Sequence, residues 1–143
     1  GYGEEEDNIK ELVKELDLGT QVMFFKDIGD DLKNALIAKS NIFVMPSVIY
    51  KTSVEGFGIA YVEAAQYGVA SLGGKDGGAP DAIQHDKTGL ICDGNNLDDI
   101  YSSLNSMIED KKYLELGKNA KELSSKFYWS NIVENYKKIL KAS

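Results

Sequence analysis

Short apolar runs alternate along the chain with longer segments in which apolar residues recur at helical spacing. The runs are unbroken and partly β-branched. They are VMFF at 22–25, IFVMP at 42–46, VASL at 69–72 and GLIC at 89–92. Unbroken apolar runs of this length are typical of strands covered on both faces of a parallel sheet. We therefore predict a strand at each run.

Amphipathic helical patterns fill the intervals and continue after the last run. They cover residues 5–17, 31–39, 59–67, 80–85, 97–109, 111–125 and 130–141. Asp30 or Asp31 is expected to cap the second of these helices, and Asn95 or Asn96 the first one after the last strand. Strands that alternate with helices in this way form right-handed β-α-β units. The predicted fold class is α/β, a three-layer Rossmann-like parallel sheet with helices on both faces, in a single domain at 1–143.

The chain opens on GYG and passes into a predicted helix with no strand before it. A dinucleotide-binding fingerprint requires a preceding strand and a third glycine, and both are missing here. We expect GYG to end a strand-to-helix loop whose strand lies upstream of Gly1. The sheet would then be incomplete, without its first strand or strands.

Composition and charge exclude several classes of protein. Sixteen Lys and Arg are outnumbered by 23 Asp and Glu, which gives a net charge of -7. This balance argues against a protein that binds nucleic acid through phosphate contacts. The single cysteine, Cys92, excludes an internal disulfide and favours a reducing compartment. No run of about 18 apolar residues is present. We expect an acidic, cytoplasmic domain.

Ligands of open α/β sheets bind beyond the carboxyl ends of the strands. In this sequence those ends lead into loops at 26–29, 47–58, 73–80 and 93–94. The second and third of these loops are the longest and the richest in glycine. We therefore expect any binding site to lie there.

The second loop runs into the stretch VEGFGIAYVEA at 54–64, where Glu55 and Glu63 flank a glycine-broken helix start. Glycines let a ligand approach the free N–H groups of the first helical turn, where the helix dipole favours an anion. Eight helical residues span about 12 Å, close to the length of a sugar diphosphate unit. Two carboxylates around an anion site can accept hydrogen bonds from hydroxyls. A ligand with hydroxyls at both ends and phosphates in the middle is a nucleotide sugar. Acids favoured at a helix start by the dipole alone remain the alternative.

Three motifs in order resemble the donor-binding lobe of retaining glycosyltransferases of family 4, which have the GT-B fold. They are VEGFGIAYVEA, GVASLGGKDGGAPDAI and DKTGLI. The E-x7-E element of that family matches Glu55 and Glu63. GGAPDAI with TGL looks most similar to the branch that contains phosphatidylinositol mannosyltransferases. The resemblance extends from GYGEEED to the closing FYWSNIVENYKKIL.

The resemblance implies a role for each matching position. Glu55 would contact hydroxyls of the donor sugar as the catalytic residue, and Glu63 would bind both ribose hydroxyls. The backbone at four positions would line the donor sugar and its diphosphate: Phe57, Gly58, Ile59 and Ala60. The base would lie against the loop after the first predicted strand, near Ile28 and together with Lys33. No cofactor or metal is implied, and the substrate would be a UDP- or GDP-sugar.

The resemblance also implies parts that this sequence does not contain. Family members carry an arginine and a lysine after the first strand of the lobe, and that region would lie upstream of Gly1. The N-terminal acceptor lobe of the same enzyme is the expected partner, and any membrane contact would run through it at the inner membrane face. The chain would then hold half of the active-site cleft and be inactive alone.

Several other features have simpler interpretations. His85 is expected to be solvated, and Cys92 to be a core thiol. Trp129 and Tyr136 stand seven residues apart on the last helix, which favours core or lobe-to-lobe packing. GGKDGG either passes near the phosphate or acceptor or is a flexible connection. The sequence lacks a D-x-D pair, so a metal-bridged diphosphate is not indicated.

Two functions from other classes remain as alternatives. A non-catalytic nucleotide-sugar binding or assembly domain would have the same pocket without transfer. A flavodoxin-like receiver domain would need an acidic pocket with a phospho-acceptor Asp at a strand end, which VMFF and IFVMP do not supply.

Overall fold

The computed structural model describes residues 3–142. Contacts between residues divide the chain into two compact units, Gly1–Ala35 and Leu36–Ser143. Whether the two behave as the single predicted domain stays a prediction. Gly1 and Tyr2, the first residues of the GYG motif, lie outside the described residues.

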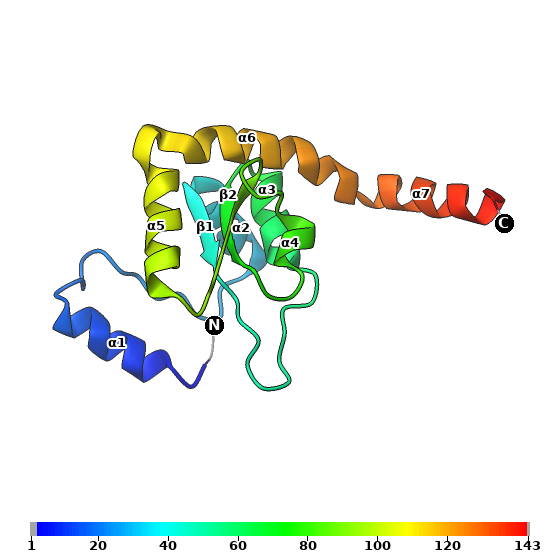
Figure 1. Ribbon diagram of the computed structural model, residues 1–143. Coiled ribbons are helices and arrows are strands. Elements are labelled where there is room, and N and C mark those ends of the chain that lie inside the picture. Colours follow the sequence, from blue (N-terminus) through cyan, green and yellow to red (C-terminus); the bar gives the residue numbers. More distant parts are fainter. Residues whose placement is uncertain (1–2, 143) are drawn as a thin grey trace. The chain divides into compact units, whose positions relative to one another are not determined.

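A three-stranded parallel sheet forms the centre of the second unit (Figure 1). Its strands are β1 (Ile42–Met45), β2 (Ala70–Gly74) and β3 (Gly89–Cys92), in the order β1-β2-β3. All five residues of the central strand β2 are buried, as its unbroken apolar pattern requires. Three of the four predicted strands are therefore confirmed.

Four helices flank this sheet within the second unit, α3 (Ile59–Gln66), α4 (Ala79–Ala82), α5 (Leu97–Ile108) and α6 (Lys112–Ser124), with the 3-10 turns η1 (Glu109–Lys111) and η2 (Ser125–Phe127) after α5 and α6. The last helix, α7 (Trp129–Ala142), follows η2 and extends away from the sheet (Figure 1). Asn96 caps α5, because its side-chain oxygen accepts hydrogen bonds from the N–H groups of Asp98 and Asp99 at 3.0 and 3.2 Å. Of the two candidate caps, Asn96 is thus the correct one.

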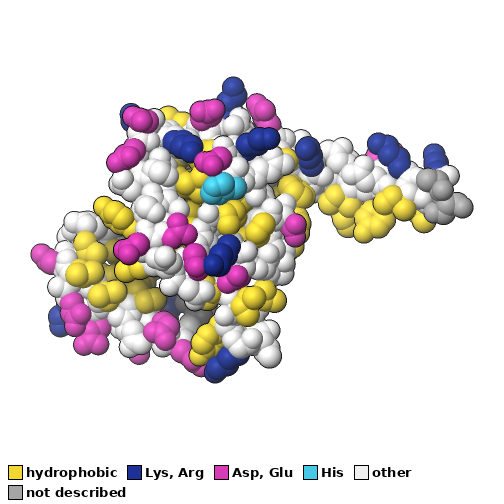
Figure 2. Space-filling view, in the orientation of Figure 1, with side chains coloured by type: hydrophobic (Ala, Val, Ile, Leu, Met, Phe, Trp, Pro, Cys, Tyr) yellow, Lys and Arg dark blue, Asp and Glu magenta, His cyan; other side chains and the backbone are white. Residues whose placement is uncertain are grey.

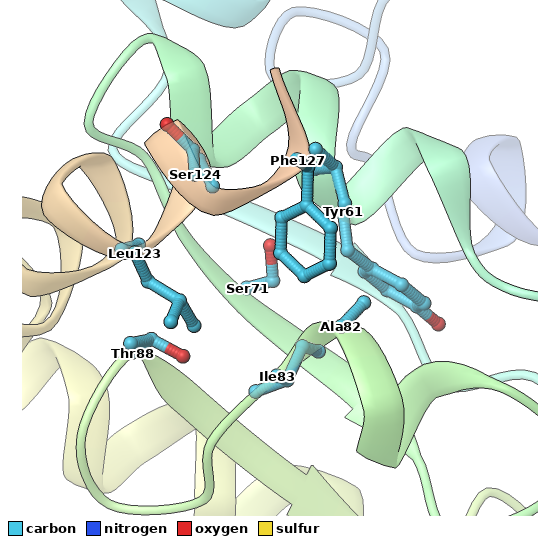
Figure 3. A pocket seen from close by; sticks show the side chains of 11 residues that line it. Tyr61, Ser71, Ala82, Ile83, Thr88, Leu123, Ser124 and Phe127 are labelled. Carbon is cyan, nitrogen blue, oxygen red and sulfur yellow. The ribbon is translucent and has the colours of Figure 1, made fainter. Parts of the chain in front are cut away.

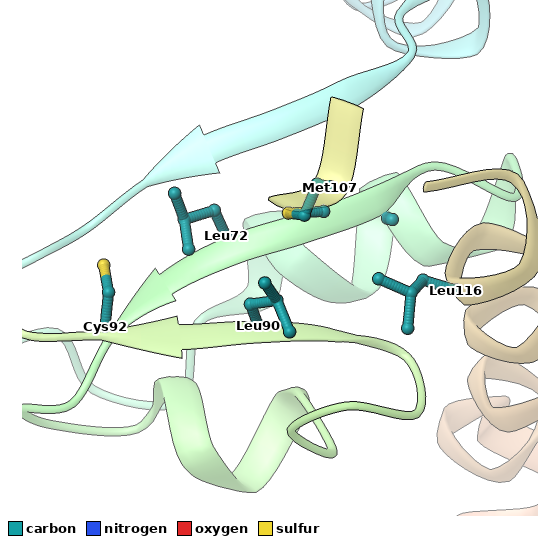
Figure 4. Packing of buried hydrophobic residues seen from close by; sticks show 6 residues of the cluster. Leu72, Leu90, Cys92, Met107 and Leu116 are labelled. Atoms are coloured by element: carbon teal, nitrogen blue, oxygen red, sulfur yellow. The ribbon is translucent and has the colours of Figure 1, made fainter. Parts of the chain in front are cut away.

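The sheet is covered on both faces, so the predicted α/β fold with helices in two outer layers is confirmed. On one face, Leu72 and Leu90 pack with Met107 of α5 and Leu116 of α6 (Figure 4). On the other face, α3 and α4 contribute a second cluster of buried side chains: Tyr61, Val62, Ala79, Ala82 and Ile83. Burying these two clusters supplies the hydrophobic driving force for the layers. It also fixes α3 against the sheet.

The first unit contains α1 (Glu6–Glu15) and the start of α2 (Asp30–Lys39). Asp30 and Asp31 lie inside the first turn of α2, not before it, where their charge still favours the helix dipole. Lys10 and Lys26 both pair with Glu6, and their hydrogen bonds lower the pKa of the Glu6 carboxyl to about 2.

The strand predicted at 22–25 is wrong. These residues have no regular secondary structure, and Met23 is 77% exposed. A β-strand requires a neighbour for its backbone N–H and C=O groups. No strand within Gly1–Ala35, over the residues described there, provides one. The run has the apolar side-chain pattern of a strand, but it lacks the neighbouring strand whose backbone would pair with it.

Candidate functional site

The start of α3 lies beyond the carboxyl end of β1, as expected for a site in an open sheet. Gly58 is the N-cap of α3, with φ 79° and ψ 47°. A Cβ built at Gly58 would lie 2.4 Å from Cδ2 of Tyr61, so both the backbone conformation and the space require glycine. The first N–H groups of α3 have no acceptor inside the helix, which makes this end a place for an anion or a carboxylate.

Glu55 occupies part of that helix end. Its Oε1 accepts a hydrogen bond from the N–H of Gly58 at 3.0 Å, and its main-chain oxygen accepts one from Gly78 at 3.0 Å. The side chain is half-buried. The alternative interpretation of Glu55, as an acid favoured by the helix dipole, therefore describes its contact in this structure. A carboxylate has a second oxygen, so this contact does not exclude binding to a sugar.

Glu63 lies one turn inside α3 and is half-buried. It borders a hollow of about 280 Å³. The other lining residues are Phe57, Ile59, Val62, Gln66, Phe127 and Ile132. The rings of Phe57 and Phe127 meet edge to face, with their centroids 5.5 Å apart. The hollow is mainly apolar, and Glu63 supplies its charged group.

The GGKDGG loop packs directly against the segment that carries Glu55. A Cβ at Gly78 would lie 1.9 Å from the carbonyl oxygen of Gly56, and one at Gly77 would lie 2.5 Å from that of Glu55. Of the two interpretations from the sequence, a flexible connection does not fit this packing. The loop instead packs against the backbone at Glu55 and supports it. Paired glycines in a sequence often mark such a close approach of two backbone segments.

Two contacts that the sequence did not predict fix the carboxyl ends of the strands. The Tyr61 hydroxyl donates a hydrogen bond to the carbonyl oxygen of Met45 at 2.5 Å, and burial raises the pKa of that hydroxyl. Lys75 follows β2 and pairs with Asp93 after β3, at 2.6 Å. This hydrogen bond raises the pKa of Lys75 and lowers that of Asp93. A cation is therefore held at the edge of the sheet where a ligand would bind.

The candidate base contacts lie in the first unit. Ile28 is half-buried, and Lys33 pairs with Asp30 at 3.3 Å. Their approach to Glu63, which belongs to the second unit, stays a prediction.

A second cavity is too small for a substrate. It lies among α3, α4, α6 and η2, and its volume is about 10 Å³, room for one water molecule (Figure 3). Two hydroxyl groups that line it already have hydrogen-bond partners. The Thr88 hydroxyl accepts a hydrogen bond from the N–H of Gln84, and the Ser124 hydroxyl donates one to the carbonyl oxygen of Lys121. We interpret it as a packing gap in the core.

The remaining candidates from the sequence are structural. Cys92 is 2% exposed, and burial raises the pKa of its thiol, as expected of a core cysteine. His85 is 54% exposed at its side chain, yet its Nδ1 accepts a hydrogen bond from the N–H of Ile91 at 2.9 Å. Trp129 and Tyr136 are 77% and 64% exposed, so neither packs in the core of this chain, and the alternative of lobe-to-lobe packing stays a prediction. Among residues 3–142, no three His, Cys, Asp or Glu side chains gather to hold a metal ion.

The fold and site define a parallel α/β domain with an anion-receptive helix end beside two carboxylates. The chain belongs to the glycosyl transferases group 1 family, whose sequence profile matches residues 1–123. The expected family resemblance is confirmed at this level.

Individual relatives agree with the family assignment. The chain is 28% identical, over 136 residues, to the GDP-mannose-dependent alpha-(1-6)-phosphatidylinositol monomannoside mannosyltransferase of Mycobacterium tuberculosis. That alignment covers 92% of this chain and 35% of the mannosyltransferase. The chain thus spans about a third of the length of this relative.

Solved structures show the same fold. Sucrose-phosphate synthase from Thermosynechococcus elongatus superposes with a TM-score of 0.79 at 25% identity, over 99% of this chain and 36% of the synthase. HepE of Anabaena, solved in complex with UDP, superposes with a TM-score of 0.78 at 26% identity, over 97% of this chain and 38% of HepE. The structural neighbours are C-terminal domains of GT-B glycosyltransferases, which confirms the predicted fold class.

Within residues 3–142, no helix combines the length and the apolar content needed to cross a bilayer.

Proposed function

We propose that this chain is the donor-binding lobe of a retaining glycosyltransferase of family 4. It binds a nucleotide diphosphate sugar, and the glycosyl group passes to an acceptor held by an N-terminal lobe of the same enzyme. The observation that carries the proposal is the α3 start, where Gly58 opens a helix end between Glu55 and Glu63. The family assignment and the UDP complex of HepE support a nucleotide sugar as the ligand.

The donor lies across the start of α3 in this proposal. The diphosphate is bound by the backbone at Ala60, and the donor sugar lies against the backbone of Phe57, Gly58 and Ile59. Glu55 keeps one oxygen on the N–H of Gly58 and offers the other to hydroxyls of the sugar. The hydrogen bond to Gly58 restrains the carboxylate, so little side-chain entropy remains to be lost on binding.

Glu63 binds the ribose at the other end of the diphosphate. It follows Ala60 by three positions, a rise of about 4.5 Å along the helix. A carboxylate accepts two hydrogen bonds from a vicinal diol with good geometry. The base then lies near Ile28 or Lys33, and both a UDP-sugar and a GDP-sugar fit this arrangement.

The chemical step follows from the charges at the helix end. As the anomeric bond breaks, negative charge grows on the diphosphate oxygens. The fixed N–H dipoles at the start of α3 stabilise this charge without reorganising, which is electrostatic catalysis. The packing of GGKDGG against Glu55 keeps these dipoles in place. The enzyme works in the cytoplasm, at the inner face of the membrane if its acceptor is a lipid.

Binding and transfer can be tested separately. Thermal shift of the protein joined to its acceptor lobe, with UDP, GDP, ADP and their sugars, should show stabilisation by one uridine or guanosine series, with the nucleotide sugar above the bare diphosphate. Stabilisation equal to that by inorganic diphosphate would contradict the proposal, because neither Glu55 nor Glu63 would then be used. Donor consumption by the protein joined to its acceptor lobe distinguishes an enzyme from a non-catalytic nucleotide-sugar binding domain.

A further inference from the structure

The segment between β1 and α3, which leads to Glu55, packs against glycines of two other loops. A Cβ at Gly74, the last residue of β2, would lie 1.9 Å from the carbonyl oxygen of Ser47. A Cβ at Gly94, after β3, would lie 2.4 Å from the carbonyl oxygen of Pro46. The loop after β2 also approaches the backbone at Glu55 itself. The loops after β2 and β3 therefore form the surface on which this segment lies.

Lys75 and Asp93 connect these two loops to each other. Nζ of Lys75 donates a hydrogen bond to Oδ2 of Asp93 at 2.6 Å, and the N–H of Lys75 donates one to the carbonyl oxygen of Cys92 at 2.8 Å. Asp93 is held in turn, because its Oδ1 accepts from the N–H of Asn95 at 3.0 Å and its own N–H donates to Asp99 of α5 at 2.7 Å. The loop after β2 is thus tied by backbone and side chain to a loop that α5 holds in place.

The surroundings of Lys75 are acidic. The hydrogen bond to Asp93 raises the pKa of Lys75, with smaller contributions from the charges of Asp76 and Asp99. On the face that Figure 2 shows, lysines around the sheet are interspersed with acidic side chains. A lysine whose charge is compensated by a carboxylate at 2.6 Å attracts a diphosphate only weakly. We interpret the pair as a link between two loops and not as an anion site.

We propose that the Lys75–Asp93 pair positions Glu55 for the donor sugar. The pair holds the loop after β2, and that loop holds the Glu55 backbone through the N–H of Gly78. The orientation of a binding group depends on such support from residues that do not touch the ligand themselves. Lys75 is therefore a positioning residue. This role rests on the proposed function, in which Glu55 contacts the sugar.

Variants of the pair test this role in the protein joined to its acceptor lobe. Lys75→Met and Asp93→Asn each break the ion pair, and Asn keeps an oxygen for the N–H of Asn95. Each should weaken binding of the UDP- or GDP-sugar selected by thermal shift about fivefold, the upper end for an exposed ion pair. The affinity for the bare nucleoside diphosphate should stay unchanged in calorimetry. The double variant should lose no more than either single one, and Lys75→Arg should retain full affinity.

Amide hydrogen exchange tests the support without any ligand. The N–H of Gly78 bonds to the carbonyl oxygen of Glu55, and the N–H of Gly58 bonds to its carboxylate. Exchange reports how often such bonds open in the folded protein. Both N–H groups should exchange about fivefold faster in Lys75→Met than in the unmodified protein.

Lys112→Met is the matched control. It removes another exposed ion pair, with Asp86 at 2.9 Å, which lies just before β3 and so at the opposite edge of the sheet from the loops that follow β2 and β3. This variant should change neither the two exchange rates nor the affinity for the nucleotide sugar.

Four results would overturn the proposed role of the pair. The first is exchange at Gly58 and Gly78 that Lys75→Met leaves unchanged, and the second is an equal acceleration by Lys112→Met. The third is faster exchange with unchanged nucleotide-sugar affinity. The fourth is an equal loss of affinity for nucleotide sugar and bare diphosphate, since Lys75 would then be a phosphate contact. Failure of the proposed function is distinguishable, because it would appear in the unmodified protein as nucleotide-sugar affinity no higher than that for the bare diphosphate.

Discussion

Glu55 is held at both its side chain and its backbone. The carboxylate accepts from Gly58 N–H, and the carbonyl accepts from Gly78 N–H. A side chain restrained in this way can have two roles, one in the stability of α3 and one in binding. The two roles depend on different properties, because the hydrogen bond from Gly58 needs only an acceptor oxygen, whereas binding and catalysis at a sugar use the negative charge.

Glu55→Gln and Glu55→Ala should therefore differ in stability and agree in activity. Gln retains an acceptor for Gly58, so the free energy of unfolding should stay within about 0.5 kcal/mol. Ala removes the hydrogen bond to the Gly58 N–H and should lower that free energy by about 0.5–1.5 kcal/mol. Both should abolish transfer in the complete enzyme while sparing nucleoside diphosphate binding. Urea unfolding and calorimetry measure the two effects, with Glu11→Ala in α1 as the control. Equal loss of diphosphate and nucleotide-sugar affinity would mean that the donor lies in the opposite orientation.

Glu63→Ala should weaken nucleotide binding. A lost hydrogen bond to a charged acceptor costs about 1.5–3 kcal/mol, or roughly 10- to 100-fold in affinity. The loss should appear for the bare nucleoside diphosphate as well as for the nucleotide sugar, since the ribose is common to both. Glu115→Ala, which removes an exposed carboxylate from α6 that does not line the hollow, is the control. Unchanged diphosphate affinity in a folded Glu63→Ala variant would remove the ribose role.

At the scale of elements, the sequence predicts what depends on side-chain pattern and misses what depends on pairing. The runs at 42–46, 69–72 and 89–92 became strands because each lies beside another in one sheet. The equally apolar run at 22–25 did not, because a pattern of side chains carries no information on whether a neighbouring strand is present. The helix at 130–141 was also predicted, and α7 confirms it. The exposure of its side chains Trp129 and Tyr136 depends on which surfaces lie near the helix, and the pattern does not encode this.

The candidate site follows the same division. The E-x7-E spacing and the glycines at 56 and 58 placed the helix end correctly, because Gly58 needs a left-handed backbone conformation. The support from Gly77 and Gly78 is a contact between two loops about 20 residues apart, which no local pattern encodes. His85 was expected to be solvated, yet it accepts a hydrogen bond from the outermost strand β3 at Ile91. Such partners become known only when the fold is known.

Gly78→Ala should disturb the site from outside it. The backbone angles of Gly78, φ -85° and ψ 0°, suit alanine, so any effect comes from space alone. The added Cβ would lie 1.9 Å from the carbonyl oxygen of Gly56, and these two backbone segments would have to separate. We expect the free energy of unfolding to fall by about 1–3 kcal/mol and nucleotide-sugar binding to weaken. Gly19→Ala, where nothing lies within 4 Å of the new Cβ, is the control. Unchanged binding in Gly78→Ala would show that the loop does not position Glu55.

At the scale of the whole molecule, the proposed function makes the chain one side of a binding cleft. The relatives it matches are about three times its length. Its second unit holds the helix end and both carboxylates. In the proposed function, the acceptor lobe and a basic pair for the diphosphate come from other parts of the enzyme. Without that basic pair, only the N–H groups of α3 would bind the donor phosphates. The net charge of -7 on the chain would repel them.

The 143-residue chain alone should therefore transfer no sugar and bind its donor weakly. Two missing charge-assisted contacts, at about 1.5–3 kcal/mol each, weaken binding by roughly two to four powers of ten. An open cleft also leaves the anomeric carbon in water, where fixed dipoles lose much of their effect because the dielectric constant is high. Calorimetry with the nucleotide sugar and a donor-hydrolysis assay measure the two quantities. Adding the acceptor lobe should restore both, whereas micromolar affinity with turnover by the chain alone would show that its own residues form a complete active site.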